Sequence, residues 1–576
     1  MNVIPGDSMI ILVAFTYILT FFTRYNLRSD DLNIYIPYIE KLIYGGRLGP
    51  QYDYQAFYWI LSLYQKAFYH FFPNIDILPM GLIVTSTTIV LFVLIYLTFR
   101  FLYQWLKKTD TTNHLLFFVI MMYTLFQFWY IVYPSYGNTF RRLNVVWILM
   151  TLSYYMRNPN QKLVFLMSFE LLTLINFSST GIFLNAFLLY GIAHLFAYTK
   201  QTDIFKKIWI LSIPFSIWLI LYNIAYLYPM LVFHCLMMVM VLIKKMHILD
   251  ALWIKYHNGV LFAFPLIFTL CAWLSPSLFA AYRPWINFFT NPEYEMLIHY
   301  LRFDFSTTYF VLSSLVNIGF WSALFYALYK SMRISKIEVS SILYLIFILL
   351  LTFFNPFVAR FVISNLTQLA YFRIYDILFN PFTLYLYFWV LINSIQHVKI
   401  KRVMVVLSLM IFVMGTINSD VWPYLDFSGK TDPIHHVNKD ELNVFKKLED
   451  YVAQEEMREP INIIVQIHGA HLLTNLELNR QTSQRINNIE DLFSKQDDGS
   501  KLNQIFLIKD SSEVKFTPPY KETCQLTQAI DTQFVIVEAQ YNWDVEHELG
   551  YCAEKIFEVG NYRVFRMRYE WLSFAR

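Results

Sequence analysis

The chain has 576 residues, of which 57% are hydrophobic, 19% aromatic and only 15% charged. Soluble proteins carry roughly 25% charged residues, so this composition excludes an ordinary soluble multidomain enzyme, a disordered chain and a nucleic-acid-binding protein. Residues 1–419 hold 28 Lys and Arg against 15 Asp and Glu, whereas residues 420–576 hold 17 against 26. A basic, apolar body is therefore followed by an acidic segment of the size of a soluble domain.

Apolar stretches approaching the roughly 20 residues that a membrane-spanning helix needs recur along the body. We predict thirteen spans, at 9–23, 79–104, 114–133, 142–156, 163–177, 180–198, 208–228, 229–243, 260–280, 308–330, 339–358, 373–395 and 402–418. Several are short enough to be broken or tilted. The sequence thus predicts an α-helical polytopic membrane protein over residues 1–419.

Basic residues are unevenly shared between the connections on the two sides of these spans. One set of connections holds 16 of them, 13 being Lys, and the other set holds 11, nine being Arg. Because cytoplasmic loops carry the excess of basic residues, we expect the Lys-rich set to be cytoplasmic. The N-terminus is then cytoplasmic, and residues 420–576 form an extracytoplasmic domain.

The first external connection, residues 24–78, contains two segments that we expect to lie on the membrane surface. Apolar residues recur at helical spacing over 30–43, which indicates an amphipathic helix. The stretch 56–72 is aromatic and apolar but includes Gln65 and Lys66. Counting it as a span would place the Lys-rich connections outside, so it is interpreted as an interfacial helix.

The C-terminal segment has the pattern of a small α/β domain. Helical periodicity covers 439–453. Gly560-Asn561 inside the last apolar run is typical of a hairpin turn. Strands are predicted at 461–467, 505–508, 533–537 and 556–567.

Two adjacent acids, Asp30 and Asp31, follow the first span at the start of the amphipathic helix. Acids at a helix N-terminus complement the helix dipole, which is a sufficient structural reason for them. A carboxylate held at the membrane surface is also suited to act as a general base. Adjacent residues point to different faces of a helix, so at most one of the two is expected to act.

This organisation resembles the GT-C glycosyltransferase superfamily: a first span, an external loop with an acidic pair, two surface helices, many further spans and an external domain. Short stretches are similar to Gram-positive bacterial members of it, namely Gly137-Asn-Thr-Phe-Arg141-Arg142, Asn176-Phe-Ser-Ser-Thr-Gly181, Asn355-Pro-Phe, Tyr371-Phe-Arg373-Ile-Tyr-Asp376 and Asn380-Pro381. The resemblance covers residues 1–420. It implies Asp31, or otherwise Asp30, as the catalytic base and a sugar on a polyprenyl phosphate as the donor.

The chemistry of such a donor agrees with the residues present. A phosphate leaves as an anion, so a single base is enough, whereas a glycosidase needs two carboxylates. The site must instead place positive charge at the leaving phosphate, and the guanidinium fork suits phosphate oxygens. Candidates at external ends of spans are Arg141, Arg142, Arg360 and Arg373. The alternative is that these side chains pair with lipid phosphate or with Asp376.

Other polar residues are weaker candidates for a role in function. Asp53, between the two surface helices, either contacts a sugar or is simply solvated. Glu170 lies inside a span and should face the bundle, hydrogen-bonded for instance to Asn176 or Ser178. A possible metal-binding group occurs in the 281–307 loop, but ordinary loop residues are the simpler interpretation: Glu293, Glu295, His299 and Asp304. No cofactor is expected, and a divalent metal stays open as the less favoured alternative.

We therefore expect an enzyme that moves a sugar from a polyprenyl-phosphate lipid to an envelope glycan or a teichoic-acid-like acceptor. Two alternatives from other classes stay open. One is a transporter or flippase of lipid-linked glycans, which would need a basic path open to either side in turn. The other is a membrane scaffold whose external domain binds wall polymers, which would need neither a site nor a path.

Of the four cysteines, Cys524 and Cys552 lie outside the predicted spans. The predicted topology puts both in a non-reducing compartment, where disulfides persist. They either form a bridge or remain two buried thiols. A bridge requires Cα atoms within about 7 Å of each other.

The topology can be tested with an impermeant thiol reagent and an epitope tag. A tag inserted after residue 430 should be accessible from outside intact cells. A cysteine introduced near Lys206 should react only after permeabilisation, because that connection belongs to the Lys-rich set. Labelling of that cysteine in intact cells would overturn the thirteen-span arrangement.

Overall fold

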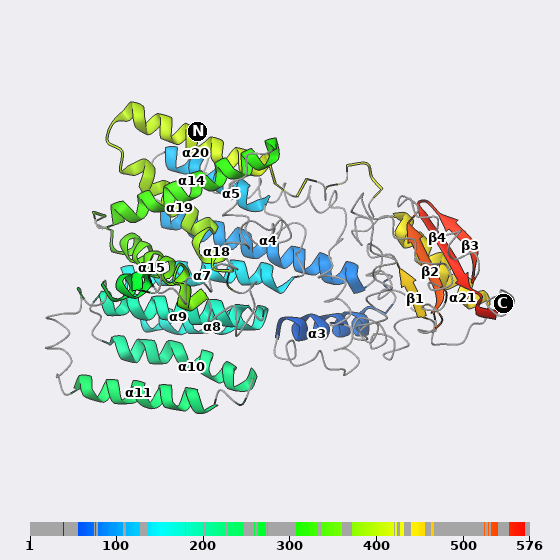
Figure 1. Cartoon of the computed structure of the whole chain (residues 1–576), viewed down its shortest axis with the longest axis horizontal. Coiled ribbons are helices and arrows are strands. Elements are labelled where there is room, and N and C mark those ends of the chain that lie inside the picture. Colours follow the sequence, from blue (N-terminus) through cyan, green and yellow to red (C-terminus); the bar gives the residue numbers. More distant parts are fainter. Residues whose placement is uncertain are drawn as a thin grey trace.

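The computed structural model places the helices of the body side by side and sets a small sheet domain beyond one end of them (Figure 1). It describes residues 56–73, 79–106, 111–126, 136–178, 180–199, 203–222, 227–245, 263–271, 307–331, 336–359, 373–419, 439–455, 462–465, 532–538 and 552–570, together with single positions or short stretches between these ranges.

The helices of the body coincide with the apolar stretches of the sequence. They are α3 (Ala56–Phe71), α4 (Pro79–Leu106), α5 (Thr111–Leu125), α7 (Gly137–Arg157), α8 (Gln161–Phe177), α9 (Gly181–Tyr198), α10 (Ile204–Tyr222), α11 (Leu227–Lys245), α14 (Thr308–Ser331), α15 (Ile337–Phe353), α18 (Tyr375–Leu378), α19 (Pro381–Asn393) and α20 (Val398–Ile417). The predicted span 9–23 lies outside the described residues, as does the helix 30–43 apart from Ile39, and 260–280 is described only in part.

The predicted class, an α-helical membrane protein with a small C-terminal sheet, is confirmed. Within the described residues, four helices are long and apolar enough to cross a membrane: Gly81–Trp105, Gly181–Tyr198, Phe310–Ser331 and Val398–Ile417. Shorter apolar helices cover Leu115–Leu125, Met230–Val239, Ile337–Phe353 and Pro381–Asn393. The total of thirteen spans stays a prediction.

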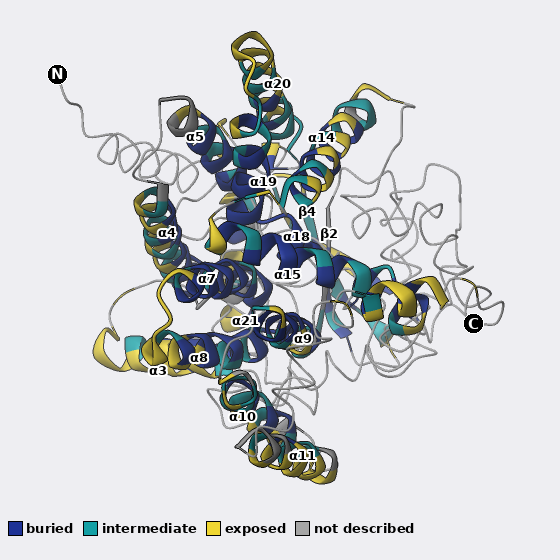
Figure 2. Ribbon diagram, turned by 90° about the vertical axis from the view of Figure 1, so that its left-hand side faces the viewer, coloured by how far each residue is buried: buried dark blue, intermediate teal, exposed yellow. Residues whose placement is uncertain are grey.

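Helix α7 occupies the centre of the body. It packs against α4, α8, α15, α18 and α19, and most of its residues are buried. Figure 2 shows buried residues concentrated in α7, α15 and α19, while α11 and α20 present exposed residues at the periphery. A helix enclosed by protein can carry polar groups that lipid would not tolerate, and α7 buries Asn138, Arg141 and Asn144.

The predicted span 373–395 is wrong in one respect, because it is two helices rather than one. The four-residue helix α18 ends at Leu378, and α19 begins at Pro381. Asn380 caps α19: its Oδ1 accepts from the backbone N–H of Thr383 (3.1 Å), and the Thr383 hydroxyl accepts from the backbone N–H of Asn380 (3.0 Å). This capping box and a proline at the first helical position start a new helix here.

The described part of the C-terminal segment is a helix packed on a four-stranded sheet. The elements are α21 (Lys439–Gln454), β1 (Asn462–Val465), β2 (Thr532–Glu538), β3 (Ala553–Val559) and β4 (Tyr562–Met567). The strand order is β1-β2-β4-β3, with β1 and β2 parallel and the other pairs antiparallel. Gly560, with φ of 56°, makes the predicted turn between β3 and β4. The predicted strand 505–508 lies outside the described residues.

The two faces of this sheet are covered differently. Phe534 and Ile536 of β2 share an apolar cluster with α21. Val535, which points to the other face, clusters with Cys524 and Cys552. These two cysteines form a disulfide with Cα atoms 5.9 Å apart. Cys552 directly precedes strand β3.

The disulfide predicts the outcome of a thiol titration. Under denaturing, non-reducing conditions the chain should show two free thiols, Cys235 and Cys271, and four after reduction. A loop of this length should stabilise the C-terminal domain by roughly 3–4 kcal/mol. As a control, replacing Cys235 and Cys271 by Ser should remove the titratable thiols of the unreduced protein. Four thiols before reduction would contradict the bridge.

Candidate functional site

The N-terminal end of α7 carries the two adjacent arginines that the sequence singled out. The helix begins at Gly137, before the predicted boundary at residue 142, so Arg141 and Arg142 lie within its first turns. Neighbouring residues on a helix of 3.6 residues per turn point about 100° apart. The Arg141 side chain is accordingly fully buried, whereas that of Arg142 is 19% exposed.

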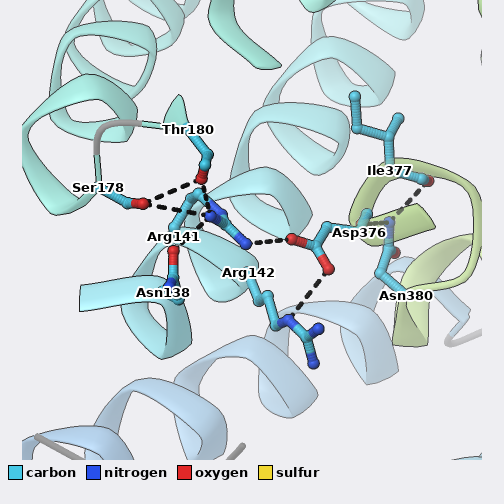
Figure 3. A network of polar contacts seen from close by, with 8 residues as sticks. All are labelled: Asn138, Arg141, Arg142, Ser178, Thr180, Asp376, Ile377 and Asn380. Atoms are coloured by element: carbon cyan, nitrogen blue, oxygen red, sulfur yellow. Dashed lines mark hydrogen bonds and ion pairs between the residues drawn. The ribbon is translucent and has the colours of Figure 1, made fainter. Parts of the chain in front are cut away.

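Arg141 is surrounded by acceptors (Figure 3). Its Nη2 lies 2.6 Å from Oδ2 of Asp376, a residue 235 positions away in sequence. Its Nη1 donates to the side-chain oxygens of Asn138 and Thr180 and lies 3.3 Å from the Ser178 hydroxyl. A guanidinium that is removed from water needs hydrogen-bond acceptors and a counter-ion in place of the lost hydration.

Asp376 bridges the two arginines. Its Oδ1 is 3.0 Å from Nε of Arg142, while Oδ2 pairs with Arg141. Arg373, one turn earlier in the chain and partly exposed, lies close enough for its charge to act on both Asp376 and Arg141. Two of the four arginines proposed from sequence therefore contact one carboxylate, and a third lies near it.

The position of Asp376 follows from the corner between α15 and α19. Asn380 donates from Nδ2 to the backbone oxygens of Asp376 (3.1 Å) and Ile377 (3.0 Å). The backbone N–H of Asp376 donates to the oxygen of Arg373 at 3.0 Å. Tyr371 donates its hydroxyl to the backbone oxygen of Phe353 at the end of α15. These bonds connect the residues before α19 to one another and to the end of α15, and α18 packs against α7.

A close approach of α7 and α8 brings the second set of acceptors to Arg141. A Cβ atom on Gly137 would collide with the backbone carbonyl of Phe177, so only glycine fits there. The rings of Phe57, Phe140 and Phe177 pack together at this point, with centroids 5.0–5.8 Å apart. Ser178 and Thr180 follow directly and face Arg141 (Figure 3).

The start of α3 is joined to the same place. Asn176 accepts, through Oδ1, a hydrogen bond of 3.4 Å from the backbone N–H of Ala56. Helix α3 begins at Ala56 and belongs to the predicted external connection 24–78, so this bond joins that connection to the chain two residues before Ser178. Helix α3 also packs against α4 and α8.

The remaining sequence-based candidates lie outside the described residues: Asp30, Asp31, Asp53 and Arg360, together with Glu293, Glu295, His299 and Asp304. Among the described residues, no group of three or more His, Cys, Asp or Glu side chains could hold a metal ion.

The sequence reasoning missed the polar residues that hold the cluster. Asp376 was considered only as the alternative partner of an arginine, and Asn138, Ser178 and Thr180 were not singled out as acceptors. The expected partners of Glu170 were wrong as well. Its Oε1 accepts from Thr151 (2.9 Å) and its backbone oxygen from Asn144 (2.7 Å), both on α7. A signal was available, since an arginine inside an apolar helix requires acceptors from neighbouring helices.

Comparison with known proteins finds a likeness of fold and no match of sequence. No protein-family model matches the chain, and no curated protein matches it significantly. The fold is similar to crystal structures of the oligosaccharyltransferase of Archaeoglobus fulgidus. The apo form is 11% identical with a TM-score of 0.47, and the form tethered to an acceptor peptide is 10% identical with a TM-score of 0.48.

The likeness covers 96% of this chain and 74% of the oligosaccharyltransferase. At this TM-score and identity, the activity of the chain has to be proposed from its own residues.

The close approach at Gly137 gives a prediction about stability. Replacing Gly137 by Ala should destabilise the protein by about 1–3 kcal/mol, because the backbone of Phe177 must move away. The melting temperature of the purified protein in detergent measures this. Gly259→Ala is the matched control, since its added Cβ would meet nothing within 4 Å. Equal melting temperatures for the two variants would contradict the tight α7–α8 contact.

Proposed function

We propose that the chain is a membrane glycosyltransferase that transfers a sugar from a polyprenyl-phosphate donor to a cell-envelope acceptor on the outer membrane face. The observation that supports this most directly is the gathering of Arg141, Arg142 and Arg373 around Asp376 at one end of the bundle. Residues distant in sequence converge there, as expected of a site for an anionic group.

The depth of the cluster suits a lipid phosphate. Helix α7 has 21 residues, and at 1.5 Å per residue it is about 31 Å long, close to the hydrocarbon thickness of a bilayer. As part of this proposal, we place its first turns at the level of the lipid headgroups. The connection from α7 to α8, with Arg157 and Lys162, lies at the opposite end. This arrangement agrees with the predicted topology, in which the cluster is extracytoplasmic.

In the proposed reaction, an arginine of the cluster binds the phosphate that leaves with the polyprenyl chain. Positive charge fixed beside this group stabilises the negative charge that develops on it. Asp31, or otherwise Asp30, removes the proton of the acceptor hydroxyl. The bond between Ala56 and Asn176 supports this assignment, because it joins the predicted external connection 24–78 to the segment that carries Ser178 and Thr180. The proposed reaction needs no metal.

The acceptor in this proposal is an envelope glycan or a teichoic-acid-like polymer. A flippase would need polar groups available along the bundle. In α7, Asn144 and Thr151 are bonded to Glu170 of α8. In this described part of the bundle the groups join helices, an arrangement that favours the transferase over the flippase.

Substituting Asp31 by Asn tests the catalytic assignment. Transfer of a labelled sugar from a polyprenyl-phosphate donor, measured in membranes that contain the protein, should fall by the ~10²–10⁴-fold typical of a positioned base. Membrane insertion and melting temperature should stay as in the wild type, because amide and carboxylate have the same shape. The Asp53→Asn variant is the comparison that tests whether Asp53 contacts the sugar. Wild-type transfer by the Asp30→Asn/Asp31→Asn double variant would rule out the acidic pair as the base.

A further inference from the structure

We infer that the end of the bundle opposite to the arginine cluster binds an anionic phospholipid. The binding surface, here named the basic patch, is formed by the connections from α14 to α15 and from α19 to α20. Its residues are Lys330, Arg333, Lys336, Lys399 and Arg402. None of these residues takes part in the proposed transfer reaction.

The course of the chain places the basic patch about one helix length from the arginine cluster. Asn380, which bonds the backbone of Asp376, caps the start of α19. From there α19 runs for 13 residues, or about 20 Å, to the α19–α20 connection. Helix α15 spans the same distance in the other direction, from Ile337 beside the α14–α15 connection to Phe353, which Tyr371 bonds at the corner before α19.

Two side-chain contacts hold the two connections side by side. The hydroxyls of Tyr326, near the end of α14, and Ser394, which follows α19, share a hydrogen bond of 2.7 Å. Nζ of Lys336, just before α15, lies 4.8 Å from the ring centroid of Trp389 in α19. Helix α14 also packs against α19 and α20, and Figure 2 shows these three helices together. Basic residues that are distant in sequence therefore gather in one region of the surface.

The charge of the basic patch is not balanced by acidic side chains. Residues 329–338 and 393–402 contain six basic residues and one acid, Glu338. Every ion pair within the described part of the chain uses an acid from outside these two segments. Lys330 lies instead over the rings of Tyr326 and Tyr329, with its Nζ 5.6 and 5.3 Å from their centroids. Such a ring attracts a cation but carries no net charge, so the patch stays positive.

Two of the helices that are long and apolar enough to cross a membrane end at this patch. Phe310–Ser331 finishes at the α14–α15 connection, and Val398–Ile417 starts from the α19–α20 connection. With 22 and 20 residues, they are about 33 and 30 Å long, close to the hydrocarbon thickness of a bilayer. As part of this inference, we place the basic patch at the headgroup level of one leaflet, which the predicted topology makes the cytoplasmic one.

The surface next to the patch favours a lipid over a soluble anion. After Lys399 and Arg402, helix α20 exposes Val403, Val406 and Met410, and only 11% of its membrane-spanning part is buried. A phospholipid can set its phosphate against the basic side chains and its acyl chains along this apolar face. Inorganic phosphate or an acidic soluble protein gains nothing from the apolar face.

A role in topology alone predicts a different behaviour. Basic residues in cytoplasmic connections orient a membrane protein during insertion, and for that purpose they need not converge. In the folded protein, such residues would not select one phospholipid over another at a defined place. Selective binding that requires both connections therefore distinguishes the basic patch from topology signals.

The experiment is native mass spectrometry of the purified full chain in detergent, titrated with phosphatidylglycerol or with phosphatidylcholine. Both lipids carry a phosphate and two acyl chains, but only phosphatidylglycerol has a net charge. The wild-type protein should bind phosphatidylglycerol at least about tenfold more tightly. Lys330→Gln/Lys336→Gln and Lys399→Gln/Arg402→Gln should each weaken that binding by about twentyfold, at roughly fivefold for each basic residue removed near an anionic headgroup.

Arg157→Gln/Lys162→Gln is the matched control. It also removes two positive charges from exposed residues, in the α7–α8 connection, and should leave the affinity for phosphatidylglycerol unchanged. The Lys399→Gln/Arg402→Gln variant keeps the test independent of folding, because these two exposed side chains form no ion pair within the described residues. Its melting temperature in detergent should equal that of the wild-type protein.

Equal affinity of the wild-type protein for the two lipids would overturn the inference, as would wild-type affinity in either of the two patch variants. An equal loss in the control variant would mean attraction by net charge alone and would overturn the basic patch as a site. Displacement of bound phosphatidylglycerol by excess inorganic phosphate would overturn the lipid as its ligand. Retention of the lipid in phosphate, together with the losses given above, supports the inference.

Discussion

The buried ion pair between Arg141 and Asp376 is the interaction on which the arrangement of the body depends. A guanidinium with no exposed surface is stable only with a counter-ion in contact. That requirement forces α18 against α7, although the two residues are 235 positions apart. It also explains the many hydrogen bonds in the residues before α19. Without them, the carboxylate of Asp376 would not stay within contact distance of two arginines.

A second constraint follows from placing such a pair inside an apolar bundle. Helix α7 carries most of the buried polar groups around the pair, and it is enclosed by α4, α8, α15 and α19. Hydrogen bonds between helices satisfy those groups, as between Asn144 and the backbone of Glu170. Helices at the periphery expose most of their side chains. In α20, for example, the buried residues are Ser408 and Phe412. The position of a helix in the bundle therefore decides how polar it can be.

Much of the fold could be predicted from sequence because apolar length and helical periodicity are local properties. They located α4, α9, α14 and α20 to within a few residues. The start of α7 was placed too late because the boundary was drawn where the apolar run begins, whereas Asn138 and Arg141 are helical and satisfied by other helices. The break before α19 depends on a capping box. Its two hydrogen bonds, between Asn380 and Thr383, are seen only in the structure. Pairing with Asp376 could be stated from sequence only as the alternative to phosphate binding, because nothing in one sequence decides which of several distant arginines a carboxylate contacts.

The separation of Arg141 and Asp376 also affects the order in which the chain is assembled. Helix α7 enters the membrane long before α18 has been made, and at about 5–20 residues per second the 235 intervening residues take on the order of 10–50 s to synthesise. During that interval Arg141 has no carboxylate, but Ser178 and Thr180 arrive within 39 residues. In order of synthesis, the α7–α8 hairpin therefore supplies Arg141 with hydroxyl acceptors long before the chain supplies its counter-ion.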